Sequence, residues 1–263
     1  MLDIRHEGDP TGQPVLLLHG FPQSGASWDR VWPALAEAGY RVMIPDQRGY
    51  SPGLRPARRS DYRLEELVED VVGLIDTPAH VVGHDWGAAV GWAVAIRRPE
   101  LLRSLTAVSV PHPGAMAKAL VTSRQALDSW YMLAFQLPLV PERLLLARDA
   151  ALLRRVLLGT GLDPASTDEY VTRMREPGAL TAALNWYRGL PFSRSPVRPV
   201  AVPTLYVWGE RDFALNRKGA ETTVDHVTGP YEFVSLPGAG HWIPERHAPE
   251  LLDPLLRHLR RHG

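Results

Sequence analysis

The chain of 263 residues has no cysteine, no net charge and no long apolar run. The lack of cysteine excludes a disulfide framework, a thiolate nucleophile and a Cys-based metal site, and it fits a reducing compartment. The 29 basic and 29 acidic residues balance. This balance argues against a nucleic-acid-binding protein, which carries a basic excess to offset phosphate charge, and against a polybasic membrane-surface protein.

The longest apolar runs, such as Val15–Leu18 and Ala88–Ile96, are too short to span a bilayer. The first residues are polar and acidic, so they lack the basic start and apolar run of a signal peptide. We therefore expect a cytoplasmic protein, monomeric or homodimeric, with no membrane or nucleic-acid partner. The length allows one large α/β domain, or a core domain with an insert.

Short apolar runs alternate with helical patterns along most of the chain. Runs of this kind, rich in Val, Leu and Ile, are typical of strands buried on both faces of a parallel sheet. The alternation predicts right-handed βαβ units in a doubly wound sheet, where chemistry collects at the carboxyl ends of the strands. The predicted strands are Val15–His19, Tyr40–Pro45, His80–Asp85, Leu105–Val110, Thr204–Gly209 and Tyr231–Leu236, and the predicted helices are Trp28–Ala38, Leu64–Ile75, Gly87–Arg97 and Glu250–Arg261.

The alternation stops between about Gly114 and Pro199, where no buried strand is evident. We divide the chain into a core of residues 1–113 and 199–263 and a helical lid of residues 114–198. A helical insert over the strand ends excludes water from the site below it. The predicted lid helices are Met116–Phe135, Pro141–Leu158, Thr167–Arg175 and Gly178–Leu190.

One strand-turn-helix segment has the spacing of a nucleophile elbow. Around Asp85, small residues stand at positions −2, +2 and +3, namely Gly83, Gly87 and Ala88. A strained turn of this kind presents its central side chain at the top edge of the sheet, and it directs the N–H of Trp86 toward a developing anion. The simpler interpretation is a capped helix start, because Asp is a good N-cap residue.

The central residue of the elbow is Asp, where Ser is usual, and this decides the chemistry. A serine must lose a proton before it attacks, whereas the carboxylate of Asp85 is already ionised at neutral pH. A carboxylate displaces a leaving group from saturated carbon and becomes an alkyl ester. Water activated by a histidine then hydrolyses that ester. The pattern therefore favours epoxide opening or carbon–halogen cleavage over ester hydrolysis.

Three further segments follow predicted strand ends and supply partners for Asp85. In His-Gly-Phe-Pro, the N–H of Phe21 is a candidate oxyanion donor. Asp212, with Glu210 as a local competitor, is placed to orient a histidine. His241 lies in a glycine-rich loop after the last strand and completes the order nucleophile, acid, base.

The remaining histidines near strand ends suit structural hydrogen bonding better than catalysis. These are His19, His84 and His112. The spacing of His241 and His247 does not match the helical zinc-binding pattern. We therefore predict no metal site.

At these motifs the sequence resembles the α/β-hydrolase superfamily and, within it, the epoxide hydrolases. The matching segments are His19-Gly-Phe-Pro22, Asp46-Gln-Arg-Gly-Tyr-Ser51, Gly83-His-Asp-Trp-Gly87, Gly209-Glu-Arg-Asp212 and Gly240-His-Trp242. The resemblance implies an α/β-hydrolase fold with its lid inserted after the sixth strand of the fold, and an enzyme that needs no cofactor. Little sequence precedes Val15, so the first strand of that fold is missing or short, and Asp3–Glu7 can supply one edge strand.

The resemblance also implies two lid tyrosines that hydrogen-bond the epoxide oxygen and protonate it. The segment Trp130–Pro138 places one of these roles on Tyr131, and Leu184-Asn-Trp-Tyr-Arg188 places the other on Tyr187. Aromatic residues on helices are more often part of a core, and Tyr170 is another lid tyrosine. The expected substrate pocket consists of Phe21, Trp86, Phe135, Trp186 and Trp242.

Two other functions stay open at this point. A dehalogenase uses the same carboxylate nucleophile and holds the halide with N–H donors, for which Trp86 and Trp186 are available. A ligand-binding relative of the hydrolases with little turnover is the third possibility, although the intact nucleophile, acid and base argue against it. The expected partner is a small-molecule epoxide.

Overall fold

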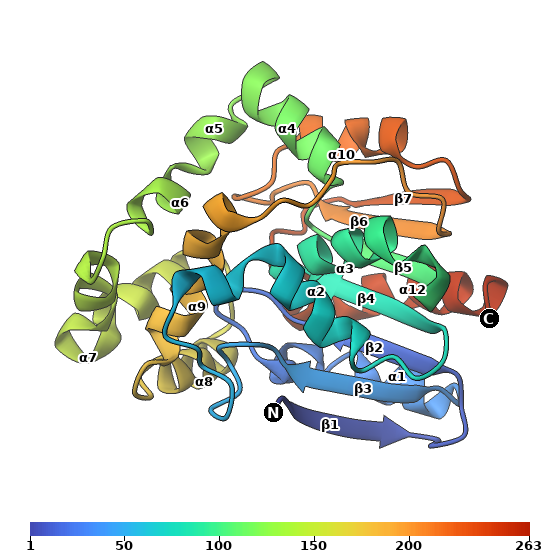
Figure 1. Cartoon of the computed structure of the whole chain (residues 1–263), viewed down its shortest axis with the longest axis horizontal. Helices are drawn as coiled ribbons and strands as arrows, with labels where there is room; N and C mark the ends of the chain where they lie inside the picture. The colour runs from blue at the N-terminus through green and yellow to red at the C-terminus, as the bar shows by residue number, and fades with distance from the viewer.

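The computed structural model describes residues 1–263 and has a central sheet of seven strands in the order β1-β3-β2-β4-β5-β6-β7 (Figure 1). β1 pairs with β3 in antiparallel orientation, and every other pairing is parallel. The predicted doubly wound, mostly parallel sheet is confirmed. The strands are β1 (Asp3–Gly8), β2 (Pro14–Leu18), β3 (Arg41–Asp46), β4 (Ala79–His84), β5 (Leu102–Val108), β6 (Thr204–Gly209) and β7 (Tyr231–Leu236).

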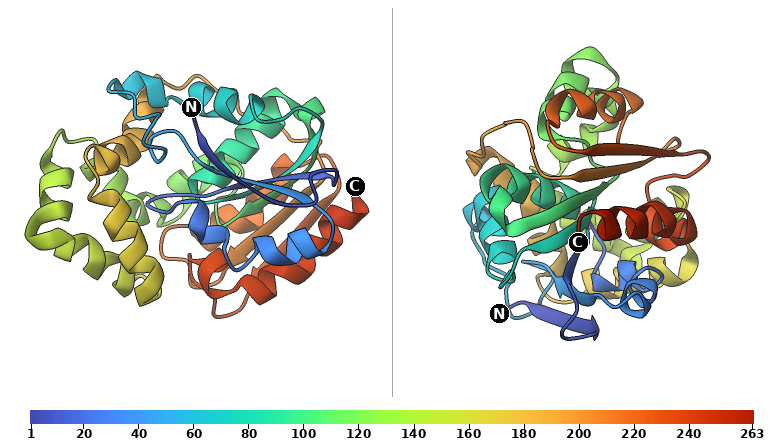
Figure 2. Two further views of the ribbon diagram at one scale, coloured as in Figure 1. Left: turned by 90° about the horizontal axis from the view of Figure 1, so that it is seen from below. Right: turned by 90° about the vertical axis from the view of Figure 1, so that its right-hand side faces the viewer.

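Alternate residues of the strands face two separate hydrophobic clusters. Leu16 and Leu18 of β2 belong to the cluster on one side, whereas Val15 and Leu17 belong to the other. Figure 2 shows α2 and α3 on one face of the sheet and α1 and α12 on the opposite face. The core helices are α1 (Trp32–Glu37), α2 (Leu64–Val72), α3 (Trp86–Arg97), α10 (Arg217–Thr222), α11 (Ile243–Arg246) and α12 (Ala248–Arg261), with 3-10 turns η1 (Gly25–Trp28), η2 (Arg59–Tyr62), η3 (Pro99–Leu101) and η5 (Thr223–His226).

The segment that was expected to supply an edge strand does so. β1 occupies the edge of the sheet, and its register pairs Asp3 with Asp46 and Gly8 with Arg41. No other strand lies outside β1 in the sheet order. The sheet is therefore completed on this side by one antiparallel strand.

A run of helices between β5 and β6 covers the carboxyl ends of the strands (Figures 1 and 2). The insertion follows β5, the fifth strand of this chain. The helices of this run are α4 (Pro113–Thr122), α5 (Gln125–Asp128), α6 (Trp130–Ala134), α7 (Val140–Gly159), α8 (Pro164–Met174), α9 (Ala179–Gly189) and the 3-10 turn η4 (Leu190–Phe192).

The single helix expected over Met116–Phe135 is instead three short helices, α4, α5 and α6. The backbone of Ser123 is extended, with φ −145° and ψ −171°. Its hydroxyl donates to the carbonyl of Ala119 and accepts from the N–H of Gln125. A serine that bonds to neighbouring backbone in this way competes with helix continuation, so the prediction of one helix was wrong. The expected helix Trp28–Ala38 is likewise shorter, since α1 begins at Trp32.

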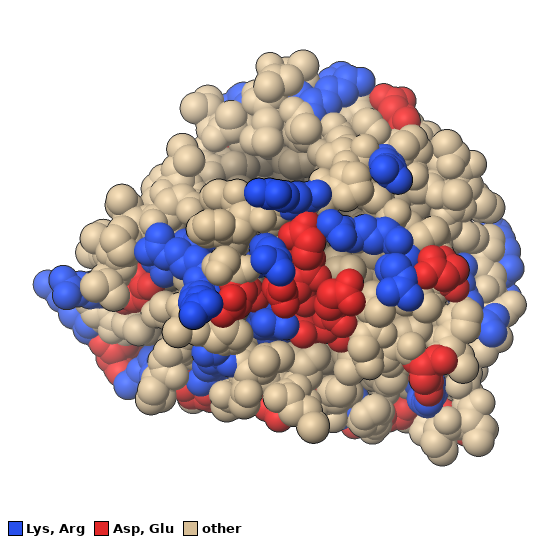
Figure 3. Space-filling model, viewed as in Figure 1, with Lys and Arg blue, Asp and Glu red and all other residues tan.

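Charged side chains of both signs are interspersed on the surface. Figure 3 shows acidic and basic groups side by side near the middle of one face. Among the ion pairs, Arg48 pairs with Asp70 at 2.6 Å, and Arg97 pairs with Glu65 at 3.0 Å. None of the helices combines the length and the apolar character that crossing a membrane requires.

Candidate active site

Asp85 lies in a strained turn between β4 and α3. Its backbone has φ 51° and ψ −120°, a region that a non-glycine residue rarely adopts. The flanking glycines are required by close packing: a Cβ on Gly83 would lie 2.3 Å from the carbonyl oxygen of Gly87, and a Cβ on Gly87 would lie 2.1 Å from that of Leu18. The structure thus has the elbow geometry that the glycine spacing predicts.

The two carboxylate oxygens of Asp85 have different neighbours. Oδ1 accepts a hydrogen bond of 2.9 Å from the N–H of Phe21, and Oδ2 lies 3.6 Å from Nε2 of His241. Burial raises the pKa of the Asp85 carboxyl, but His241, His84 and the Phe21 N–H outweigh burial and hold the pKa below its ordinary value. The carboxylate is therefore ionised at neutral pH.

His241 lies between two carboxylates. Its Nδ1 donates to Oδ2 of Asp212 at 2.9 Å, and Oδ1 of Asp212 accepts from the N–H groups of Ala214 and Leu215 at 2.8 and 3.0 Å. Burial lowers the pKa of the imidazole, but Asp212 and Asp85 outweigh that effect and raise the pKa to about 10. The structure brings Asp85, Asp212 and His241 together as the sequence predicts.

The alternative acid and bases make other contacts. Glu210 is exposed and accepts a hydrogen bond from Ser235. His19 is buried and contacts the backbone of Gly20 and Gln47. His112 accepts from the N–H of Gly114 and contacts the carbonyl of Arg198. His84 is also enclosed by polar groups of the chain, between Gln23 and the carbonyl of His241.

Two cavities of about 300 and 410 Å³ meet at Asp85. Four residues line both of them, namely Asp85, Tyr131, Tyr187 and Ala214. Figure 3 shows the surface hollowed below α4 and α5, on the side of the first cavity. The carboxylate and the two lid tyrosines thus stand at the junction of the two cavities, with mostly apolar side chains on either side.

The two tyrosines come from different lid helices and lie in one aromatic cluster. Tyr131 belongs to α6 and Tyr187 to α9, and their ring centroids are 6.1 Å apart. Tyr187 also contacts the rings of Trp86 and Phe21, at 5.1 and 5.4 Å. Burial, with the nearby charge of Asp85, raises the pKa of both phenols. Both hydroxyl groups therefore keep their protons at neutral pH.

A buried ion pair fastens the helix of Tyr187 to the segment after Tyr131. Arg188, which is 3% exposed, makes a two-pronged contact with Glu142 at 2.6 and 3.0 Å. The same guanidinium donates to the carbonyls of Phe135 and Leu137, each at 2.7 Å. Sequence reasoning missed this pair, because no local pattern links residues 142 and 188.

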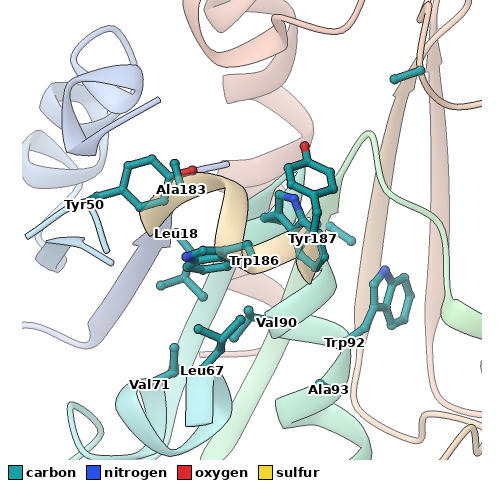
Figure 4. Close-up of a cluster of buried hydrophobic side chains, with 14 of the residues drawn as sticks. Leu18, Tyr50, Leu67, Val71, Val90, Trp92, Ala93, Ala183, Trp186 and Tyr187 are labelled. Carbon is teal, nitrogen blue, oxygen red and sulfur yellow. The ribbon is translucent and has the colours of Figure 1, made fainter. Parts of the chain in front are cut away.

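The expected pocket residues divide into those that line a cavity and one that does not. Phe21, Phe135 and Trp242 line the larger cavity, and Trp86 lines the smaller one. Trp186 lines neither: its indole N–H donates to the carbonyl of Arg48 at 2.8 Å. Figure 4 shows its side chain diverging from that of Tyr187 toward the cluster that contains Leu18 and Val90.

One lining residue that the sequence analysis did not name is Phe213. It stands beside Asp212, is 45% exposed and contacts the ring of His241 at a centroid distance of 5.2 Å. Its position next to the candidate acid was the available signal.

The structure contains no group of three or more His, Cys, Asp or Glu side chains arranged to hold a metal ion.

Comparison with known proteins agrees with this fold. Residues 13–248 match the family model described as the alpha/beta hydrolase fold. The chain belongs to the α/β-hydrolase superfamily and, within it, to the epoxide hydrolases. The family that the sequence motifs resemble is confirmed.

Three similar proteins illustrate the relationship. The AB hydrolase superfamily protein YfhM of Bacillus subtilis is 38% identical over 97% of this chain and 92% of its own length. Epoxide hydrolase A of Mycobacterium tuberculosis is 31% identical, with 98% of this chain and 94% of the relative covered. The crystal structure of Epoxide Hydrolase A from Mycobacterium thermoresistibile superposes with a TM-score of 0.85 at 30% identity, covering 98% of this chain and 94% of that one.

Proposed function

We propose that this protein opens an epoxide to a vicinal diol through an alkyl ester on Asp85. The observation that carries the proposal is the junction of the two cavities, where a carboxylate on the core faces two tyrosines of the lid. A nucleophile on one side and proton donors on the other match the needs of an epoxide. Its carbon needs an attacking anion and its oxygen, a poor leaving group, needs a proton.

In the first step an oxygen of Asp85 bonds to an epoxide carbon, and the bond from that carbon to the ring oxygen breaks. The ring oxygen takes a proton from Tyr131 or Tyr187. Because their surroundings raise the pKa of both phenols, the two hydroxyl groups hold their protons at neutral pH and serve as acids and not as bases. The cavities on either side of the junction accommodate apolar substituents on both epoxide carbons.

In the second step water adds to the carbonyl carbon of the ester. Esterification removes the negative charge of Asp85, one of the two charges that raise the pKa of His241. The imidazole then releases its proton more readily and returns it to the tyrosine that protonated the epoxide oxygen. The neutral ring next accepts a proton from the attacking water. The oxyanion forms beside the N–H of Phe21, which already contacts Oδ1 in the resting state. The N–H of Trp86 is the second proposed donor. Collapse of the tetrahedral intermediate breaks the ester bond to the substrate oxygen, which takes the remaining proton of the added water; the diol leaves and the Asp85 carboxylate and the protonated His241 are restored.

Other parts of the site support the epoxide over a halide. A halide leaves without a proton and needs only N–H donors around it. Trp186 is one of the two indole donors considered for that role, and its N–H already donates a hydrogen bond to the carbonyl of Arg48. Trp86 remains at the cavity, but two tyrosines accompany it there.

A single turnover in ¹⁸O-labelled water tests the covalent step. We expect one ¹⁸O atom in the Asp85 carboxylate and none in the first diol, because the diol takes its second oxygen from Asp85. Trypsin releases Asp85 in the peptide 64–97, which contains no internal Lys or Arg, so its mass reports the label. The Asp85→Asn variant is the control. Label in the first diol with none in the peptide would rule out the ester. Diol and halide are assayed together on a panel of epoxides and haloalkanoates.

A further inference from the structure

A buried carboxylate with no part in the proposed reaction lies behind the active-site loop. Glu245 of α11 is 4% exposed. Its Oε1 accepts hydrogen bonds from Nε2 of Gln23 at 2.6 Å and from the hydroxyl of Tyr170 at 2.9 Å. A buried carboxylate without partners is strongly unfavourable; these two donors satisfy Oε1, while Oε2 is buried without a hydrogen-bond partner. Burial still raises the pKa of Glu245 to about 7.

Gln23 connects this carboxylate to the candidate oxyanion donor. While its amide nitrogen donates to Glu245, its amide oxygen accepts from the N–H of Gly20 at 2.7 Å. Gly20 directly precedes Phe21, whose N–H contacts Asp85. The loop is also packed tightly against the nucleophile, because a Cβ on Gly20 would lie 2.4 Å from Oδ1 of Asp85. A shift of Gln23 therefore shifts the oxyanion donor.

The same glutamine reaches the strand end and the candidate base. Nδ1 of His84 lies 2.9 Å from the amide oxygen of Gln23, and Nε2 of His84 lies 2.9 Å from the carbonyl oxygen of His241. His84 directly precedes Asp85 in the elbow. One chain of polar contacts thus touches the loop of the oxyanion donor, the nucleophile's neighbour and the backbone of the base.

The other partner of Glu245 belongs to the lid. Tyr170 is in α8 and is 1% exposed, so its hydroxyl group cannot exchange this contact for water. Because one oxygen of Glu245 accepts from both Tyr170 and Gln23, the lid helix and the oxyanion loop are held at a single atom.

We propose that Glu245 is a positioning residue, which holds the Gly20–Phe21 loop against Asp85 through Gln23 and ties that loop to lid helix α8 through Tyr170. This inference rests on the proposed function, since it assigns the loop to stabilising the ester's oxyanion. Its effect falls on hydrolysis of the ester, the step in which negative charge grows on the oxygen beside Phe21.

Glu245→Ala removes the acceptor and leaves Gln23 without an anchor. We expect ester hydrolysis to slow by about 10- to 100-fold, less than the loss of a whole oxyanion donor, with kcat/KM changed little because that ratio reports the earlier alkylation step. The alkylated enzyme then accumulates during turnover, which intact-protein mass spectrometry detects after rapid quenching. Glu245→Gln keeps an oxygen that can accept both hydrogen bonds, so we expect it to restore hydrolysis to within about threefold of the native rate.

A second set of variants separates positioning from stability. Leu255→Ala opens a void in the hydrophobic cluster that contains Val15 and Leu17 of the sheet. We expect this variant to lower the melting temperature and to leave ester hydrolysis unchanged. Gln23→Ala breaks the same link at its other end, and it replaces Glu245→Ala as the test if the latter does not fold. We expect the same accumulation of ester in Gln23→Ala.

The outcomes distinguish this inference from the function on which it rests. If the native protein forms the Asp85 ester but a folded Glu245→Ala or Gln23→Ala hydrolyses it at the native rate, the positioning role is wrong and the epoxide hydrolase proposal stands. If Glu245→Gln hydrolyses the ester as slowly as Glu245→Ala does, the positioning role is also wrong, because the two hydrogen bonds that glutamine can still accept would then not be what supports hydrolysis. If the native protein forms no ester, the proposed function itself fails.

Discussion

Nε2 of His241 lies 3.6 Å from Oδ2 of Asp85, close enough for their charges to interact strongly while the imidazole keeps its hydrogen bond to Asp212. In the resting protein the imidazole is therefore a cation between two anions. A general base must be neutral, so the ring becomes competent only when one of the anions is neutralised. In the proposed mechanism, formation of an ester on Asp85 neutralises one anion, so the order of the two proposed steps follows from electrostatics.

The first prediction concerns the pKa of His241. In the native protein the imidazole stays protonated up to about pH 10, because Asp212 and Asp85 both favour the cation. Asp85→Asn removes one anion, so the pKa falls; a nearby opposite charge is typically worth roughly 1 to 3 pKa units. Histidine-selective NMR measures this pKa, with His241→Gln identifying the signal among ten histidines. An unchanged pKa would show that Asp85 does not hold the proton.

The second prediction concerns the lid tyrosines. Replacing Tyr187 by Phe removes one proposed proton donor and keeps the ring contacts with Trp86 and Phe21. We expect kcat/KM on epoxides to fall by at least about 10-fold in this variant and in Tyr131→Phe, and by about 10²-fold or more in the double variant. Stopped-flow measurement of Asp85 alkylation isolates the affected step.

The matched control for these variants is Tyr170→Phe, which removes a lid hydroxyl that lines neither cavity. We expect it to leave alkylation near the native rate, since its hydroxyl contacts Glu245 and not the substrate. If the double variant is alkylated at the native rate, neither tyrosine donates the proton to the epoxide oxygen.

The third prediction tests the packing of the oxyanion loop. In Gly20→Ala the new methyl group would lie 2.4 Å from both Cβ and Oδ1 of Asp85, so the loop or the nucleophile must move. We expect activity to fall by at least about 10²-fold, in keeping with the cost of misplacing reacting groups by about 1 Å. Gly159→Ala is the control, since nothing lies within 4 Å of a Cβ there. Equal activity in the two variants would contradict the close approach.

The sequence predicts those parts of the site that are encoded locally. The glycines around Asp85 and the loop positions of Asp212 and His241 follow from turn and strand signals within a few residues. Gln23 and Glu245, in contrast, are 222 residues apart, and Arg188 and Glu142 are 46 apart. No local pattern pairs such residues, so only the folded chain reveals their contacts.

The direction of lid side chains is the other feature that the sequence leaves undetermined. Almost every residue of α9 is buried, because the helix packs on all sides. Hydrophobic periodicity distinguishes a buried face from an exposed one, and α9 has no exposed face. Trp186 and Tyr187 are therefore equivalent in the pattern, although only Tyr187 reaches the cavities.

The last prediction concerns the ion pair that holds the tyrosine helices together. Arg188→Met keeps much of the side-chain volume but leaves the carboxylate of Glu142 buried without its partner, and it frees the carbonyls of Phe135 and Leu137. Breaking a buried pair by removing one partner typically costs about 3 to 5 kcal/mol. We expect a loss of this size in the free energy of unfolding measured with urea.

The surface pair of Arg98 with Glu100, at 2.7 Å, provides the control, since exposed pairs contribute about 0 to 1 kcal/mol. Arg98→Met should therefore unfold nearly as the native protein does. Because Arg188 also fixes α9 against the segment after α6, alkylation of Asp85 should slow in folded Arg188→Met, whereas Arg98→Met keeps the native rate. A large loss of stability with an unchanged alkylation rate would mean that the pair supports the lid without setting the spacing of Tyr131 and Tyr187.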